Sequence, residues 1–166
     1  YTINFIDRTI ANVLINPIKT DLNLSDKEMG LLGGFAFAVL YAIMGLPFAW
    51  LAERKSRLTI ISASLAFWSV MTALCGAATT FTQLILARVG VGVGEAGSGP
   101  AAQSLISDLY PPHRRATALS VYSLGVPIGT LFGALFGGYL ASRFGWRQAF
   151  LVVGLPGLLL AVVIQL

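Results

Sequence analysis

The sequence predicts an all-α membrane protein with six transmembrane helices. Of its 166 residues, 56% are hydrophobic and only 11% are charged, and the mean hydropathy is +0.79. A soluble domain of this length would need a far larger polar surface. A helix needs about 20 apolar residues to cross the hydrocarbon core of a membrane. Six stretches qualify, with approximate ends: 1–16, 29–50, 58–78, 82–107, 117–141 and 148–166.

Helices rather than strands are expected because the stretches lack the period-two alternation of an outer-membrane barrel. Turn signals separate them, with Asn16-Pro17 after the first stretch and Pro111-Pro112 after the fourth. Ser25 and Glu28 have the spacing of a capping box at the start of the second helix. Both ends of the chain fall inside apolar stretches, so we expect it to be part of a longer polypeptide.

The basic residues are distributed as topology signals. Two clusters, at 54–57 and 113–115, follow the second and fourth stretches, whereas the turn at 76–82 carries no charge. Positive residues favour the cytoplasmic side, so we expect a cytoplasmic N-terminus in a cell (inner) membrane. Arg143 and Arg147 depart from this bias. The net charge of +4 therefore does not indicate a nucleic-acid binder, which would present a basic face with aromatic residues.

No cofactor or metal is expected. Cys75 is the only cysteine and His113 the only histidine, so the sequence has neither an intrachain disulfide nor a cluster of typical metal ligands. It also lacks the Gly-x-x-x-x-Gly-Lys-Ser/Thr loop of ATP-driven proteins.

Small residues recur along two of the predicted helices. Gly90 and Gly94 lie on the fourth, and Pro127 in the fifth permits a kink. In lipid, helices associate by close packing of such residues, which serves either static packing or sliding during a conformational change. The stripe on the fifth helix has four glycines at every fourth position: Gly125, Gly129, Gly133 and Gly137.

Four charged residues lie inside the predicted helices: Asp7, Arg8, Arg88 and Glu95. A charge near the bilayer centre costs roughly 2.5–3.5 kcal/mol, so such residues are functional candidates. With a rise of 1.5 Å per residue, Asp7 and Glu95 lie about 18–20 Å from the outer surface and Arg88 about 9 Å. Arg88 and Glu95 project from nearly one face, two turns apart. The set forms either a transport cavity or a structural ion-pair network.

These residue types suggest different roles. A carboxylate between a like charge and an arginine exchanges a proton when its partner changes; we expect Asp7, with Glu95, to couple protons. Arginine stays protonated and suits phosphate or carboxylate, so Arg8 and Arg88, with Glu95, are candidates for binding the substrate. Three aromatic residues are candidates for contacts with an apolar tail, although aromatics more often pack helices together: Phe35, Phe37 and Tyr41.

A short internal sequence similarity suggests an inverted repeat. Residues 49–54 end the second helix and residues 138–143 end the fifth, with three identities in six positions. By the predicted topology these ends face opposite sides of the membrane, as an inverted repeat of three helices requires.

The chain resembles, over essentially its whole length, the N-terminal six-helix half of a major facilitator superfamily transporter. The superfamily's loop motif G-x-L-a-D-R-x-G-R-R is matched by residues 49–58, Ala-Trp-Leu-Ala-Glu-Arg-Lys-Ser-Arg-Leu, with both glycines and the last basic residue replaced. The resemblance implies a cytoplasmic gate formed by Glu53, Arg54 and Arg57.

Two further motifs of the superfamily are present. Arg88, Gly92 and Ala96 match its fourth-helix arginine-glycine motif, and residues 145–147 with Phe150 resemble the start of its sixth helix. The resemblance implies a twelve-helix fold, of which this chain is a 3+3 inverted repeat and the C-terminal half is absent.

Within the superfamily, residues 4–8 and 88–96 are most similar to the Spinster family. Residues 67–69, 120–122 and Pro127 fit the same pattern. The resemblance implies a proton-coupled secondary transporter that moves a lysolipid such as sphingosine 1-phosphate by alternating access. Its partners would be protons, the amphipathic substrate and the bilayer, and it would act as a monomer with its missing half.

Other readings remain open. Organic-anion symporters of the superfamily carry a similar Asp-Arg pair and Gly-Glu-Ala run, so an organic anion is the alternative substrate. An intramembrane enzyme would need a nucleophile and base, a metal cluster or paired carboxylates, and only Asp7 with Glu95 is arguable. A non-transporting receptor is the third possibility.

Overall fold

The computed structural model describes residues 1–54 and 56–165, with the side chains of residues 33, 35–40, 49, 52 and 53 outside the description. The described part is all-α, as predicted, and contains no strand. Its elements are α1 (Thr2–Val13), α2 (Ile15–Leu22), α3 (Asp26–Gly30), the π-helix η1 (Leu31–Phe35), α4 (Ala36–Arg54), α5 (Arg57–Ala77), α6 (Phe81–Leu109), α7 (Pro112–Ser123) and α8 (Gly125–Gln165).

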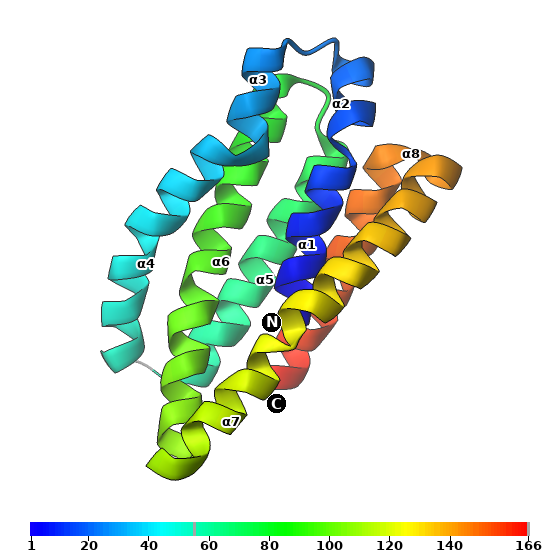
Figure 1. Ribbon diagram of the computed structural model, residues 1–166. Coiled ribbons are helices and arrows are strands. Elements are labelled where there is room, and N and C mark those ends of the chain that lie inside the picture. The colour runs from blue at the N-terminus through cyan, green and yellow to red at the C-terminus, as the bar shows by residue number, and fades with distance from the viewer. Residues whose placement is uncertain (55, 166) are drawn as a thin grey trace.

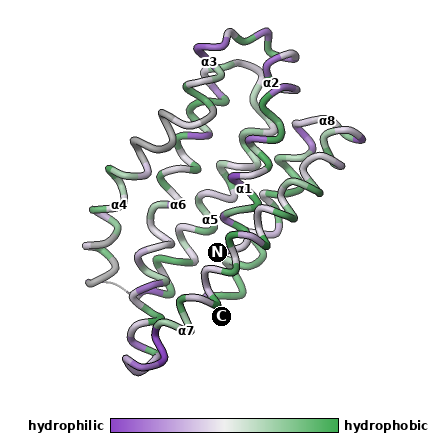
Figure 2. The backbone as a smooth tube through the Cα atoms, viewed as in Figure 1, coloured by the Kyte–Doolittle hydropathy of each residue, from purple (hydrophilic) through white to green (hydrophobic). Residues whose placement is uncertain are grey.

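The long helices run side by side along one axis of the bundle (Figure 1). α5 packs between α6 and α8, α1 packs against α8, and α4 packs against α6. We call the end with the turns at 23–25 and 78–80 the Ser25 end. The opposite end, with the turn at 110–111 and the start of α5, is the Pro111 end. Hydrophilic residues concentrate at these two ends, and the middle of the bundle is mainly apolar (Figure 2).

The predicted turn at Asn16-Pro17 is wrong. The chain bends at Leu14, with φ −83° and ψ −3°, and then continues as α2 to Leu22. Pro17 is the third residue of α2, where a missing N–H costs little because the first turn of a helix has no internal acceptors for its N–H groups. The helical segment therefore ends at the left-handed Asn23, φ 50°.

The second helical segment begins at the predicted capping box. The Glu28 N–H donates to Ser25 Oγ at 3.3 Å, and the Ser25 N–H donates to Glu28 Oε2 at 2.8 Å. The segment then passes through η1 into α4. The periodicity of the sequence did not predict this π-helical turn.

The predicted fifth and sixth helices are joined in an unexpected way. α7 ends at Ser123, and Pro127, whose ring nitrogen has no hydrogen to donate, follows in the first turn of α8. α8 then reverses direction at Gly145, whose φ of +82° suits a residue without a Cβ (Figure 1). By length and hydropathy, two described helical stretches could each cross a membrane, Arg57–Ala77 and Pro112–Gln165, and the second includes both predicted helices.

The glycine stripe of α8 forms a close helix contact, as predicted. All four glycines are buried, and a Cβ added at Gly129 would lie 2.4 Å from the Thr2 carbonyl oxygen of α1. On α6, a Cβ at Gly94 would lie 2.8 Å from the Trp68 side chain of α5. These glycines let α1 and α6 approach their neighbours, which fixes where the charged residues of both helices lie.

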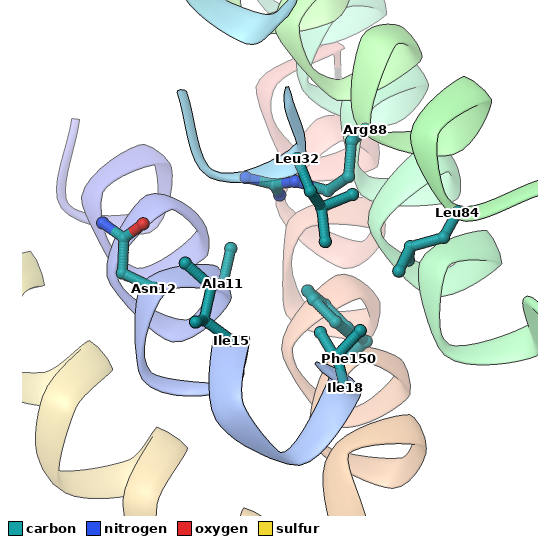
Figure 3. Close-up of a pocket in the computed structure, with 8 residues that line it drawn as sticks. All are labelled: Ala11, Asn12, Ile15, Ile18, Leu32, Leu84, Arg88 and Phe150. Carbon is teal, nitrogen blue, oxygen red and sulfur yellow. The ribbon is translucent and has the colours of Figure 1, made fainter. Parts of the chain in front are cut away.

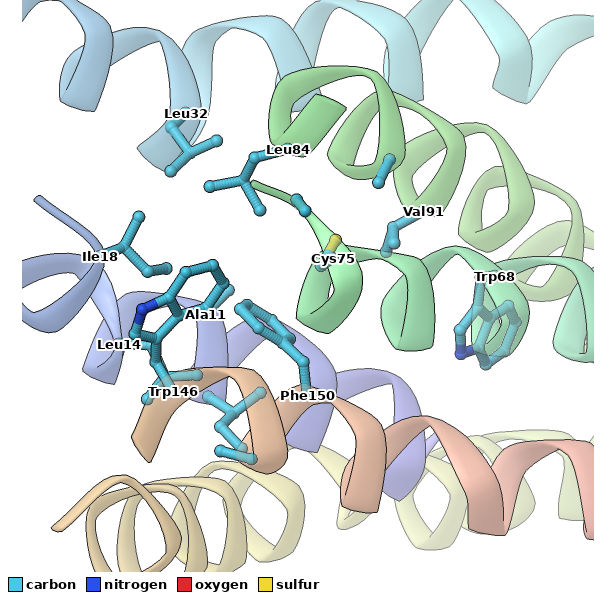
Figure 4. Close-up of a cluster of buried hydrophobic side chains, with 14 of the residues drawn as sticks. Ala11, Leu14, Ile18, Leu32, Trp68, Cys75, Leu84, Val91, Trp146 and Phe150 are labelled. Carbon is cyan, nitrogen blue, oxygen red and sulfur yellow. The ribbon is translucent and has the colours of Figure 1, made fainter. Parts of the chain in front are cut away.

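The hydrophobic core gathers toward the Ser25 end, where Leu14, Ile18, Leu84 and Phe150 are fully or almost fully buried (Figure 4). The outer surface is apolar as well. Large exposed residues on α8 include Leu131, Leu135, Leu159 and Val163. An apolar exterior of this kind suits contact with lipid tails or with further hydrophobic protein.

Candidate substrate and proton site

The site lies in the middle of the bundle, where α1 faces α5 and α6. Asn4, Asp7 and Ala11 follow one face of α1 and are buried. Asp7 is 1% exposed, and Glu95 on α6 is also 1% exposed. Each carboxylate lies within electrostatic range of the other, as expected from their similar predicted depth.

The strongest interaction of the site is an ion pair between α1 and α6. Arg8 Nε donates to Glu95 Oε2 at 2.7 Å. The Glu95 side chain is fully buried, whereas the Arg8 side chain is 29% exposed. Asn4 lies beside the Glu95 carboxylate, and the Ser98 hydroxyl donates to the Glu95 backbone carbonyl at 3.0 Å. Arg8 is thus the accessible member of a pair whose acid is enclosed.

Asp7 points to a different neighbour. Thr72 and Trp68 on α5 face its carboxyl group, and both side chains are buried. Within the described part, neither Asp7 oxygen, the Thr72 hydroxyl nor the Trp68 indole N–H has a hydrogen-bond partner. Consecutive residues on a helix project about 100° apart, since a turn takes 3.6 residues. Asp7 and Arg8 therefore serve separate parts of the site.

Arg88 lies two turns from Glu95 toward the Ser25 end of α6. It is 8% exposed and lines a small cavity of about 10 Å³ with Leu32, Leu84 and Phe150. Figure 3 shows its side chain extending from α6 toward Leu32. Arg88 also lies within electrostatic range of Asp7 and Glu95, so a permanent positive charge faces both acids.

A larger pocket lies toward the Pro111 end, with a volume of about 360 Å³. Its polar lining includes Asn4 and Ser98, the neighbours of Glu95, together with Tyr122. Its apolar lining includes Leu65 and Leu160. One pocket thus combines hydrogen-bonding groups next to the ion pair with an apolar wall.

Tyr41 is the predicted aromatic residue that the structure brings to the site. The Arg8 guanidinium lies 4.7 Å from the centroid of its ring and 5.5 Å from that of Phe5, which are cation–π distances. The side chains of Phe35 and Phe37 lie outside the described residues.

The candidate gate at the Pro111 end is described in part. Arg57 pairs with Asp108 of α6 at 2.8 Å, and its Nε donates to Ser104 Oγ at 2.8 Å. The Arg54 guanidinium lies 4.0 Å from the centre of the Trp50 ring. The side chain of Glu53 and the whole of Lys55 lie outside the described residues, so the gating role stays a prediction.

At the Ser25 end, an ion pair joins Arg147 of α8 to Asp21 of α2. Arg147 Nη1 lies 2.6 Å from Asp21 Oδ2, and the Trp146 indole N–H donates to the same oxygen at 3.3 Å. Arg147 Nη2 also donates to the Ala78 carbonyl at 3.5 Å. The segment predicted as the start of the sixth helix therefore fastens α8 to the ends of α2 and α5.

The described residues contain no group of three histidine, cysteine or acidic side chains placed to hold a metal ion.

Sequence reasoning missed several neighbours of the charged residues. It did not pair Arg8 with Glu95 directly, and it did not identify Thr72, Asn4 or Asp108 as partners. A signal existed for α5, since Trp68 and Thr72 carry polar groups one turn apart on a mainly apolar helix, although Ser62, Ser64 and Ser69 do so as well. No such signal in the sequence shows which of two nearby arginines reaches an acid.

Comparison with known proteins gives consistent matches over the whole chain. It is 41% identical over 165 residues to an MFS-type efflux pump of Mycolicibacterium smegmatis, covering 99% of this chain and 38% of that protein. It is 34% identical over 168 residues to protein spinster homolog 1 of Xenopus tropicalis, covering 99% of this chain and 31% of that protein. The chain thus spans well under half the length of these relatives.

A solved structure gives the same result. A bacterial homolog of the human lysosomal transporter Spinster, in an inward-facing and occupied conformation, superposes with a TM-score of 0.92 at 43% identity. The alignment covers 99% of this chain and 41% of that one. The family description "Major Facilitator Superfamily" matches residues 1–166. The chain is therefore an integral membrane protein that belongs to the Major Facilitator Superfamily, a family of transporters rather than enzymes.

Proposed function

We propose that this chain is the N-terminal six-helix half of a secondary active transporter that moves an amphipathic lysolipid, such as sphingosine 1-phosphate, by alternating access coupled to protons. The observation that carries the proposal is the Arg8–Glu95 ion pair, which joins α1 to α6 beside a pocket with polar and apolar walls. Buried ion pairs within a membrane are costly, so they mark substrate and ion pathways more often than static contacts.

The pair suits a zwitterionic headgroup. Arg8 is partly exposed and presents a planar donor fork that fits phosphate. A phosphate that takes Arg8 away from Glu95 leaves that carboxylate for the substrate's amine. The apolar wall at Leu65 and Leu160 then accommodates part of the tail, while Arg88 supplies further positive potential.

The relatives support a lipid-like or amphipathic cargo. One is named a probable sphingolipid transporter and another an efflux pump, and a pocket of mixed polarity suits either description. Efflux of small amphiphiles other than lysolipids is therefore the second candidate. An organic-anion symporter would use the same arginines for a carboxylate but would need no apolar wall.

In the proposed topology the protein lies in the inner membrane of the cell. Its Pro111 end faces the cytoplasm, and its Ser25 end faces the opposite side of the membrane. The basic residues Arg54, Arg57 and 113–115 lie at the Pro111 end, in agreement with the positive-inside bias. The chain start is then cytoplasmic. The missing C-terminal half would supply the opposite wall of the cavity, and the complete protein would act as a monomer.

The experiment uses the full-length protein in proteoliposomes with radiolabelled sphingosine 1-phosphate and an imposed pH gradient. We expect uptake that the gradient stimulates and that Arg8→Ala removes. Arg143→Ala, which removes an exposed arginine near the Gly145 kink, is the matched control and should transport normally. Flux of a hexuronate without lysolipid flux would favour the organic-anion alternative. Chemical alteration of the lipid would indicate an enzyme, and neither flux nor alteration would indicate a receptor.

A further inference from the structure

Two adjacent residues of α1, Asp7 and Arg8, contact different helices of the bundle. Arg8 turns toward α6 and α4, where it meets Glu95 and Tyr41. Asp7 turns toward α5, where Trp68 and Thr72 face it. Asp7, the residue proposed to bind protons, is therefore adjacent in sequence to Arg8, the residue proposed to bind the substrate. The two side chains nevertheless project from different faces of α1.

The surroundings of Asp7 on α5 contain polar atoms without partners. Trp68 is 4% exposed and Thr72 is fully buried, yet the indole N–H and the hydroxyl make no hydrogen bond within the described part, and neither do the two Asp7 oxygens. A buried polar group without a partner is costly. These atoms face one another across a helix interface, so small side-chain rotations would satisfy them together.

The charged and titratable groups around Asp7 come from three helices. Glu95 and Arg88 face it from α6, Cys75 lies near it on α5, and Arg8 follows it on α1. The two residues on α6 have opposite charges and therefore partly offset each other at Asp7. The uncharged partners on α5 are then in a position to decide which protonation state is favoured.

We propose that Thr72 is the positioning residue for the proton-binding carboxyl of Asp7, with Trp68 as an additional donor to its charged form. A threonine hydroxyl both donates and accepts. It accepts the hydrogen of the protonated carboxyl, and after the proton leaves to water it donates to the carboxylate. The indole N–H only donates, so Trp68 serves the carboxylate alone. This inference rests on the proposed proton coupling and adds a residue to it.

The test is infrared spectroscopy of the full-length protein in vesicles of phosphatidylcholine and phosphatidylglycerol, titrated with pH in the absence of substrate. A protonated carboxylic acid absorbs separately from a carboxylate, and Asp7→Asn identifies the Asp7 band by removing it. Thr72→Val keeps the shape of the side chain but removes the hydroxyl. A hydrogen bond to a charged group is lost, so the midpoint of the band should move to higher pH by about one unit.

Three further variants make the test specific. Thr72→Ser restores a hydroxyl and should return the midpoint toward that of the parent protein. Trp68→Phe should move it in the same direction as Thr72→Val, which gives a second measurement if the valine variant does not fold. Ser69→Ala is the matched control: its hydroxyl is also buried and without a partner, but it faces Gly157 on α8, so the midpoint should not move.

Unchanged midpoints in both Thr72→Val and Trp68→Phe would overturn the positioning role, and so would an Asp7 band that the Ser69 variant shifts equally. Failure of the proposed function looks different. If no carboxyl band is lost in Asp7→Asn, Asp7 binds no proton in this range and the inference falls with the coupling. If the band behaves as expected but no lipid moves in the flux assay, only the proposed cargo is wrong.

Discussion

The ion pair in the middle of the bundle and the ion pairs at its two ends have similar lengths but different consequences. In the Arg8–Glu95 pair the two charged atoms are 2.7 Å apart, and the Glu95 side chain is completely buried. Arg57–Asp108 and Arg147–Asp21 span 2.8 and 2.6 Å, with all four side chains between 33% and 55% exposed. Water screens exposed pairs, which contribute about 0–1 kcal/mol. Loss of one partner from a buried pair leaves an uncompensated charge, which costs several times more.

The end pairs also occupy positions that the predicted inverted repeat would relate to each other. Arg57 begins α5 and pairs with the end of α6, while Arg147 follows the Gly145 kink and pairs with the end of α2. Arg147 lies about 90 residues after Arg57, and Asp108 lies about 90 residues after Asp21, the separation that two inverted repeats would give. Asp7 and Glu95 have nearly the same separation. Each of these end pairs thus joins an arginine to an aspartate, whereas in the middle Glu95 is paired and Asp7 has no ion pair among the described residues.

The largest expected effect is at Arg88, the buried cation two turns from Glu95 on α6. Arg88→Ala should abolish transport by the full-length protein while it still inserts, because both acids lose a positive charge that faces them. Arg88→Lys should restore little, since a compact ammonium does not reproduce the guanidinium fork. Flux in proteoliposomes measures the loss, with protein amount checked by immunoblot. Near-normal flux in Arg88→Ala would show that Arg88 is only a packing residue. It would also weaken the contrast between the buried charges and the exposed ion pairs at the two ends of the bundle.

Glu95→Gln comes next and keeps the side chain's volume. Loss of a charge-assisted contact should weaken the binding of an amine-bearing lysolipid by about tenfold or more. The same variant should bind a lysolipid without an amine nearly as well as the parent does. Equilibrium binding of both lipids to the purified full-length protein measures the difference. Equal weakening for both lipids would show that Glu95 supports the structure rather than the headgroup.

The end pairs should respond weakly. Asp21→Asn removes the charge of an exposed partner, so thermal stability in detergent should fall by only a few degrees, about 1 kcal/mol or less. The exchanged pair, Asp21→Arg with Arg147→Asp, should recover part of that loss, and high salt should reduce the difference between the variants. A loss of transport comparable with that of Arg88→Ala would mean that the Ser25 end takes part in the cycle.

The smallest expected effect concerns Asp26, the exposed first residue of α3. The Lys19 ammonium donates to its carboxylate, and this hydrogen bond lowers the pKa of Asp26. A lowered pKa favours the folded state above the usual aspartate range, and that contribution is lost as the pH falls through the folded pKa. Lys19→Met should return the pKa toward its ordinary value, as measured by carboxyl NMR. An unchanged value would show that the pair does not persist in solution.

The sequence by itself determined the helical class, most of the helix positions and the four charged residues inside the bundle. Apolar length, capping signals and the cost of intramembrane charge are local properties, and Ser25 with Glu28 formed the predicted box. The glycine stripe also fixed a contact surface, since each glycine shortens one helix–helix distance. Local signals failed at Asn16-Pro17, because a proline within the first turn leaves a helix intact.

Only the tertiary structure decided the partners. Arg8 of α1 reaches Glu95 of α6, whereas Arg88 lies two turns from Glu95 on the same helix, because glycines let α1 pack closely on α8 and α6 pack closely on α5. Thr72 and Trp68 face Asp7 for the same reason, although they are 61 or more residues away in the chain. A side chain's direction follows from its helix, but its partner depends on how two helices are rotated and shifted against each other. Packing over their whole length sets that arrangement, and no single residue in the sequence records it.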